Sequence, residues 1–184
     1  MSTLFSVRGK TAIVTGASYG LGVTFARVLA DAGANLVLAA RTQDKLDQVS
    51  AEICNQGGQA LAIPCDVAEP SEVKELFVRA CEHFGRVDVV VNNAGIAADA
   101  GIMPEKVTDE LFLRTLQVNV SGLWCVCREA GTRMLADGKG AAKDGGEAFE
   151  WMRKAADLDD ALAADGLGVM YANAEEWQRI RLKR

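Results

Sequence analysis

The sequence contains little that would mark a membrane, metal-binding or secreted protein. No apolar run approaches the roughly 20 residues that cross a bilayer, and the opening MSTLFSVRGK lacks the apolar core of a signal peptide. The single histidine, His83, and five cysteines without zinc-like spacing provide no metal-binding pattern. We therefore expect no membrane segment, no metal, and free buried thiols in the reducing environment of the cytoplasm.

An excess of positive charge is also missing, because 20 basic and 25 acidic residues give a net charge of −5. This balance excludes the broad basic surface that nucleic-acid binding requires, and we predict no nucleic-acid partner. The basic stretch 179–184 is interpreted as a solvated helix end, where cations are favoured by the helix dipole. What is present is an ordinary globular composition, 49% hydrophobic and 24% charged, with 184 residues to bury a substantial core.

Short apolar runs alternate with helical patterns through the first half of the chain. The expected strands are 11–16, 35–40, 60–67 and 87–95, and the expected helices are 22–33, 42–58 and 70–85. Ser71 is the expected N-cap of the third helix, and Gly85 is its expected end. Since the strands are apolar almost throughout, we predict a parallel sheet covered by helices on both faces.

The pattern changes after Gly95. A loop precedes a long helix predicted over 108–136, which is apolar enough that we expect it to be largely buried. The glycine- and alanine-rich stretch 139–146 is typical of a linker. Residues 147–184 show no strand pattern, and their alanines and leucines at helical spacing predict a helical hairpin. The chain therefore divides into an α/β domain over 1–138, the linker, and a C-terminal helical part.

The most informative motif is TGASYGLG, residues 15–22, between the first expected strand and the first expected helix. Its glycines permit a tight turn and let the backbone approach a ligand closely. The turn also directs the N-terminus of a helix outward, where free N–H groups and the positive dipole end favour a phosphate. The alternative interpretation is a tight strand-to-helix turn without a ligand.

The spacing T-G-x-x-x-G-x-G resembles that of the classical short-chain dehydrogenase/reductase family. Three further motifs resemble those of the family in order and position. The first is CDV with Asp66, a residue that contacts adenine in the family, and the second is NNAG, residues 92–95, which borders the cofactor. The third is VNVSG, in which Asn119 matches an asparagine of the family's catalytic site. The resemblance covers about residues 5–138. It implies a Rossmann fold with strand order 3-2-1-4, and hydride transfer between a nicotinamide cofactor and an alcohol or carbonyl.

The resemblance also implies a set of cofactor-binding residues. They are Gly16, Ser18, Tyr19, Gly20, Leu21, Gly22, Arg41, Thr42, Asp66, Val67, Asn93, Ala94 and Gly95. An acidic residue after the second strand would bind the ribose 2′-OH of NAD, but this chain has Ala40 followed by Arg41. Because a guanidinium pairs with a 2′-phosphate, we predict NADP in preference to NAD. The alternatives are that Arg41 begins a solvated helix or stacks on adenine. One observation argues against NADP, because Tyr19 occupies a position where NADP-binding members of the family often carry a basic residue.

The catalytic centre of the family is not matched. Its chemistry uses a tyrosine as general acid/base, a lysine one helical turn later that lowers the pKa of the tyrosine, and an upstream serine. Because an unperturbed tyrosine has a pKa of about 10, the lysine is chemically required. The two tyrosines do not fit, since Tyr19 lies in the glycine loop and Tyr171 is followed one turn later by Glu175. Asn119 is the expected catalytic residue that remains.

Strands that follow the long helix in the family have no counterpart, so we predict a truncated Rossmann fold followed by an α-helical hairpin. That hairpin, over 147–184, resembles a single Sel1-like repeat, a helix–turn–helix unit. Its two helices are matched by 148–156 and 167–173, and Tyr171 would pack between them. The alternative is a generic alanine-rich hairpin.

Three functional hypotheses follow. The first is an NADP(H)-binding oxidoreductase of this family that is inactive or very weak, because the serine and the Tyr-x-x-x-Lys centre are missing. The second is a non-catalytic nucleotide-binding or protein-interaction module, and the third is a truncated or recombined reading frame. The predicted partners are a nicotinamide dinucleotide and a second copy bound through the long helix 108–136, and the alcohol or carbonyl substrate is implied by the family alone.

Overall fold

A computed structural model describes residues 6–97 and 101–136 of the chain. The chain divides into two compact units, Met1–Gly140 and Ala141–Arg184. The second unit lies outside the described residues, and with it the predicted linker and the Sel1-like hairpin. Their assignments therefore stay predictions.

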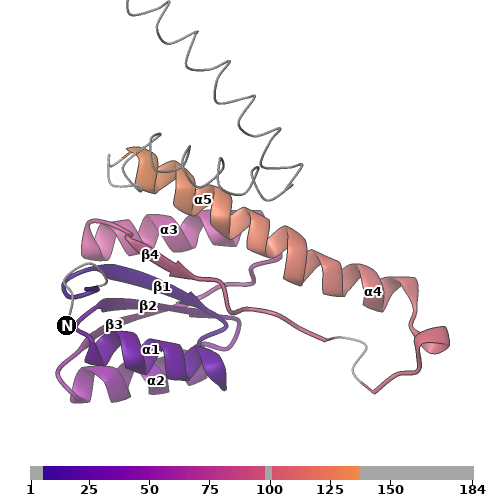
Figure 1. Ribbon diagram of the computed structural model, residues 1–184, viewed down its shortest axis with the longest axis horizontal. Coiled ribbons are helices and arrows are strands. Elements are labelled where there is room, and N and C mark those ends of the chain that lie inside the picture. Colours follow the sequence, from indigo (N-terminus) through magenta and orange to yellow (C-terminus); the bar gives the residue numbers. More distant parts are fainter. Residues whose placement is uncertain (1–5, 98–100, 137–184) are drawn as a thin grey trace, which may run out of the picture. The chain divides into compact units, whose positions relative to one another are not determined.

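Four parallel strands form one sheet in the order β3-β2-β1-β4 (Figure 1). The strands are β1 (Thr11–Thr15), β2 (Asn35–Ala40), β3 (Gln59–Pro64) and β4 (Val89–Val91). β1 is buried along its whole length and pairs with β2 on one side and with β4 on the other. The predicted α/β class, the parallel sheet and the strand order are confirmed.

Helices cover both faces of this sheet. α1 (Leu21–Asp31) and α2 (Gln43–Asn55) lie on one face, and α3 (Pro70–Phe84) and α5 (Leu123–Ala136) lie on the other (Figure 1). Successive side chains of β2 alternate between two hydrophobic cores, with Leu36 and Leu38 in one and Val37 and Ala39 in the other. This is why a strand covered on both faces is apolar throughout.

The predicted helix over 108–136 is continuous but not uniform. α4 (Asp109–Leu116) begins after Thr108, whose Oγ1 accepts a hydrogen bond of 3.3 Å from the Leu111 N–H. A π-helical segment, Gln117–Gly122, then connects α4 to α5. A side chain at Gly122 would place its Cβ 2.9 Å from Cγ2 of Val67, so glycine lets the helix pack directly on the loop after β3. π-Helical turns of this kind are rare and often occur at functional sites.

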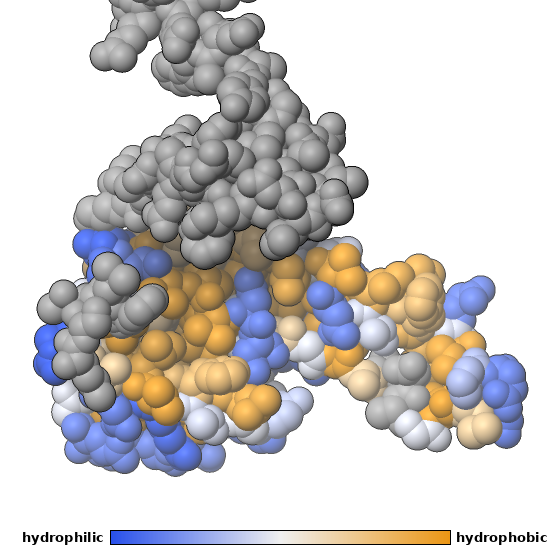
Figure 2. All heavy atoms as spheres, in the orientation of Figure 1, coloured by the Kyte–Doolittle hydropathy of each residue, from blue (hydrophilic) through white to orange (hydrophobic). Residues whose placement is uncertain are grey.

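Helix α4, the π-helical segment and the first residues of α5 expose an apolar surface (Figure 2). Its exposed side chains are Phe112, Leu113, Leu116, Val120, Leu123 and Trp124. The prediction that the long helix is largely buried is therefore wrong for α4, which contains no buried residue. Contiguous apolar surface is typical of interaction sites. The homo-oligomer through this helix stays a prediction.

Three further local predictions are wrong. The strand predicted over 87–95 is much shorter, because β4 covers only Val89–Val91. α3 begins at Pro70 with Glu69 as its N-cap, so Ser71 lies inside the first turn. Proline is suited to that position because its φ angle is already helical and it has no N–H to satisfy. All five cysteines are free, but Cys54 and Cys127 are exposed and not buried.

Within 6–97 and 101–136, no helix is both long enough and apolar enough to cross a membrane. The same ranges contain no group of three or more side chains that could hold a metal ion.

Candidate functional site

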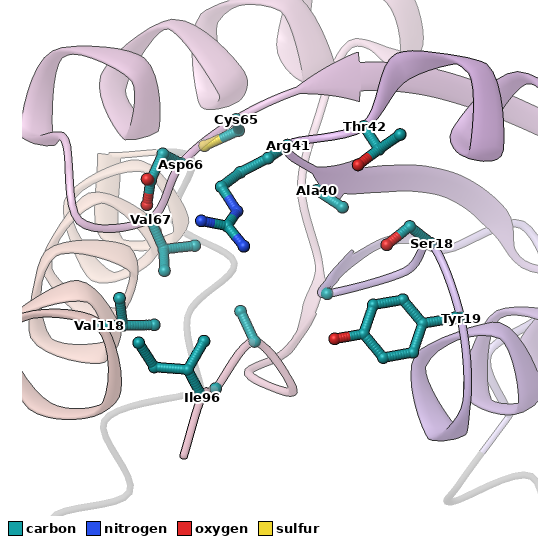
Figure 3. A pocket seen from close by; sticks show the side chains of 13 residues that line it. Ser18, Tyr19, Ala40, Arg41, Thr42, Cys65, Asp66, Val67, Ile96 and Val118 are labelled. Carbon is teal, nitrogen blue, oxygen red and sulfur yellow. The ribbon is translucent and has the colours of Figure 1, made fainter. Parts of the chain in front are cut away.

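A pocket lies at the edge of the sheet where the carboxyl ends of the strands meet (Figure 3). Parallel strands bring their carboxyl ends to one edge, so loops that are far apart in the sequence converge there. The residues that line the pocket are Gly16, Ser18, Tyr19, Ala40, Arg41, Thr42, Cys65, Asp66, Val67, Ala94, Gly95, Ile96 and Val118.

Most of the predicted cofactor-binding residues are among these lining residues. Gly20 is instead the N-cap of α1, and Leu21 and Gly22 are its first residues. Asn93 and Asn119 do not line the pocket, but they donate hydrogen bonds to the lining residues Gly16 and Ile96. Sequence reasoning missed Ala40, Cys65, Ile96 and Val118, which add apolar lining. Cys65 and Val118 belong to the CDV and VNVSG motifs, Ala40 precedes Arg41, and Ile96 follows Gly95. A position within or next to a motif is the signal that could have identified them.

The glycine loop is closely packed against the rest of the site. Gly16 and Gly20 have backbone φ angles of +66° and +60°, which residues other than glycine rarely adopt. A Cβ on Gly22 would lie 2.2 Å from the carbonyl oxygen of Gly16. The first turn of α1 carries no acidic side chain, so the positive end of the helix dipole is available to an anion.

Thr15 joins the glycine loop to the segment after β4. Its buried hydroxyl accepts hydrogen bonds from the N–H groups of Asn93 (3.1 Å) and Ala94 (3.0 Å), and it donates to the Val91 carbonyl (3.3 Å). The Asn93 side-chain amide donates in return to the carbonyl oxygens of Thr15 (3.1 Å) and Gly16 (3.2 Å). Two walls of the pocket are therefore held in one fixed arrangement.

We expect Thr15→Val to lower the free energy of unfolding by about 2 kcal/mol, because valine keeps the shape but leaves the partly buried N–H groups of Asn93 and Ala94 without the hydroxyl that accepts from them. Urea denaturation measures the change. Thr24→Val is the matched control, since the Thr24 hydroxyl makes an exposed bond to Gly20, and its effect should stay within about 0.5 kcal/mol. Equal losses in the two variants would contradict the role given to Thr15.

The side-chain amide of Asn119 makes two hydrogen bonds with the backbone of Ile96. Its Oδ1 accepts from the Ile96 N–H at 2.9 Å, and its Nδ2 donates to the Ile96 carbonyl at 2.8 Å. The oxygen also lies close to Gly95, where an added Cβ would be 3.4 Å away. Asn119 therefore fixes the segment after β4 onto the π-helical segment, and its amide is occupied by that task.

Charged groups gather around Asp66. Its Oδ1 accepts a 3.0 Å hydrogen bond from the Ala68 N–H, and its Oδ2 accepts one of 2.8 Å from Nη2 of Arg114 on α4. Burial raises the pKa of Asp66, but the Ala68 N–H, Arg114 and then Arg41 lower it by more, so the carboxylate is ionised at neutral pH. The Arg41 side chain extends into the pocket toward Asp66 (Figure 3).

Cys65 lies beside Asp66 but is not a candidate nucleophile. Burial, together with the negative charges of Glu72 and Asp66, raises the pKa of its thiol to about 12. Because the thiolate is the reactive form, this cysteine contributes apolar lining and no covalent chemistry.

Known proteins resemble much of the chain in sequence. The family model for short chain dehydrogenase matches residues 10–142. An uncharacterized oxidoreductase of Methylorubrum extorquens is 38% identical over 133 residues, which are 72% of this chain and 52% of that protein. A versicolorin reductase of Emericella nidulans is 36% identical over 136 residues, 73% of this chain and 51% of that protein. The chain thus spans about half the length of these curated relatives.

Solved structures resemble it in fold. A short-chain type dehydrogenase/reductase from Mycobacterium marinum has a TM-score of 0.71 and 37% identity, covering 76% of this chain and 57% of that one. A metagenomic short-chain oxidoreductase in complex with NADP has a TM-score of 0.68 and 33% identity, covering 73% of this chain and 61% of that one.

Proposed function

Since this chain belongs to the short chain dehydrogenase family, we propose that it binds NADP(H) in the pocket at the carboxyl ends of its strands. The observation that carries the proposal is the convergence of the glycine loop, Arg41 and Asp66 on this one pocket. The glycine loop, the Arg41 guanidinium and the Asp66 carboxylate each suit a different part of NADP(H). These parts are its pyrophosphate, its ribose 2′-phosphate and its adenine.

The local geometry fits such a ligand. Gly16 and Gly22 let the glycine loop pack directly against the first turn of α1, where the free N–H groups of a helix N-terminus favour a pyrophosphate. Arg41 supplies the positive charge for a 2′-phosphate, and the Thr42 hydroxyl lines the same part of the pocket. Asp66, ionised, provides an acceptor for the amino group of adenine.

A bound nicotinamide cofactor would supply hydride transfer. In the described part of the site, the residues of this chain bind and orient, and Asn119 holds the segment after β4 in place. Neither Tyr19 nor Tyr171 is followed by a lysine one helical turn later. We therefore expect the 184-residue chain to bind NADP(H) with little or no turnover of alcohols or ketones.

Titration of the purified 184-residue chain with NADPH tests the binding. We expect a saturable change in NADPH fluorescence that NADP⁺ reverses by competition. Absence of binding at millimolar NADPH would contradict the proposal and would favour a protein-interaction module. A panel of alcohols and ketones with NADP(H) tests the turnover, and rates typical of complete family enzymes would contradict the expected inactivity.

A further inference from the structure

We propose that Arg114 is a positioning residue for adenine recognition, holding the Asp66 carboxylate in the orientation that accepts the exocyclic amino group of adenine. The proposal rests on the proposed NADP(H) binding and names a residue that acts on the ligand only through another. Arg114 belongs to α4, far from the glycine loop in sequence, and it is not among the residues that line the pocket.

The Asp66 carboxylate is oriented from two sides. The Ala68 N–H holds Oδ1 and the Arg114 guanidinium holds Oδ2, at 3.0 Å and 2.8 Å. The backbone of Asp66 is fixed as well, because its N–H donates to Oε2 of Glu72 at 2.8 Å. A carboxylate has about four acceptor sites, so two such bonds set its orientation and leave lone pairs for a ligand.

Arg114 is itself held in place. Its Nη1 donates to Oε1 of Gln117 at 3.0 Å, while its Nη2 bonds Asp66. Gln117 is the first residue of the π-helical segment, so one guanidinium joins this irregular part of the helix to the adenine side of the pocket. A guanidinium presents several donors in one plane, and it can serve both partners without rotating.

Arg41 cannot orient the Asp66 carboxylate in place of Arg114 and also pair with the proposed 2′-phosphate. Both cations act on the Asp66 carboxylate, but Arg41 lines the pocket, where the proposed 2′-phosphate needs its charge. Arg114 bonds the carboxylate from outside the pocket lining, with 33% of its side chain exposed, compared with 21% for Asp66. The two arginines therefore have separate tasks around one carboxylate.

The probe pair is NADPH and its reduced hypoxanthine analogue, in which an oxo group replaces the amino group of adenine. The wild-type chain should bind NADPH about tenfold more tightly than the analogue, because the analogue places an oxo group where the amino group of adenine would donate to the Asp66 carboxylate. Arg114→Gln should bring the two affinities close to parity, and Arg114→Lys should restore part of the preference. Arg128→Gln on α5, which is half exposed, is the matched control and should keep the full preference.

A double-variant comparison separates positioning from direct contact. Asp66→Asn should abolish the preference for NADPH, and adding Arg114→Gln to it should change nothing further, because Arg114 acts through Asp66. If Arg114→Gln weakened both ligands equally, its role would be structural and the proposal would be wrong. The proposal would also be wrong if the effects of the two substitutions simply added.

Binding of the two ligands to the wild-type chain distinguishes failure of the proposed NADP(H) binding from failure of the proposed role of Arg114. A wild-type chain that binds neither ligand removes the proposed function and this inference together. A wild-type chain that binds both equally well removes the inference alone. If Arg114→Gln loses its cooperative thermal unfolding, Gln117→Ala provides the same comparison, and it should reduce the preference by removing the support of Arg114.

Discussion

Gly22→Ala should abolish measurable NADPH binding and lower the free energy of unfolding by about 3 kcal/mol. The added Cβ would lie 2.2 Å from the carbonyl oxygen of Gly16 and 2.7 Å from Nδ2 of Asn93. The first contact is with backbone, which cannot rotate away, so the first turn of α1 must move off the glycine loop. That movement separates the two elements proposed to hold the pyrophosphate.

NADPH fluorescence titration and urea denaturation measure the two effects. Gly131→Ala on α5 is the matched control, because nothing lies within 4 Å of an added Cβ there. Alanine in a helix is favoured over glycine by about 1 kcal/mol, so this control should be slightly stabilised and should bind NADPH normally. Wild-type affinity for NADPH in Gly22→Ala would contradict the placement of the pyrophosphate at this turn.

Arg41→Asp should reverse the cofactor preference, changing the ratio of NADPH to NADH affinity by about a hundredfold or more. The substitution removes the guanidinium that would pair with the 2′-phosphate and places a negative charge beside that phosphate. The new carboxylate can also accept hydrogen bonds from the ribose hydroxyls of NADH, which favours the other cofactor. The effect should therefore be a loss for NADPH and a gain for NADH.

Parallel titrations with NADPH and NADH at one salt concentration measure the ratio. Lys106→Asp makes the same change in net charge on an exposed 3₁₀ turn, Pro104–Lys106, and should leave the ratio unchanged. An unchanged ratio in Arg41→Asp would favour the alternatives that Arg41 begins a solvated helix or stacks on adenine.

The residue at which a strand ends cannot always be predicted from the local sequence. The run 87–95 is apolar at first and predicts a strand, but β4 covers only Val89–Val91. The backbone leaves the sheet there because the Thr15 hydroxyl, from the neighbouring strand, takes the N–H groups of Asn93 and Ala94. That partner is distant in the sequence, so the local pattern contains no signal for it.

The sequence by itself determined the sheet, its covering helices and the glycine loop, because apolar periodicity and glycine spacing are local properties. Together with the resemblance, it placed Arg41 and Asp66 at the ends of neighbouring strands. Only the tertiary structure decided that Arg114 bonds Asp66, that Asn119 is occupied by Ile96, and that Gly122 packs on Val67. These contacts join segments that periodicity treats separately, and they form only when helix α4 and the π-helical segment pack across the loops that end the strands.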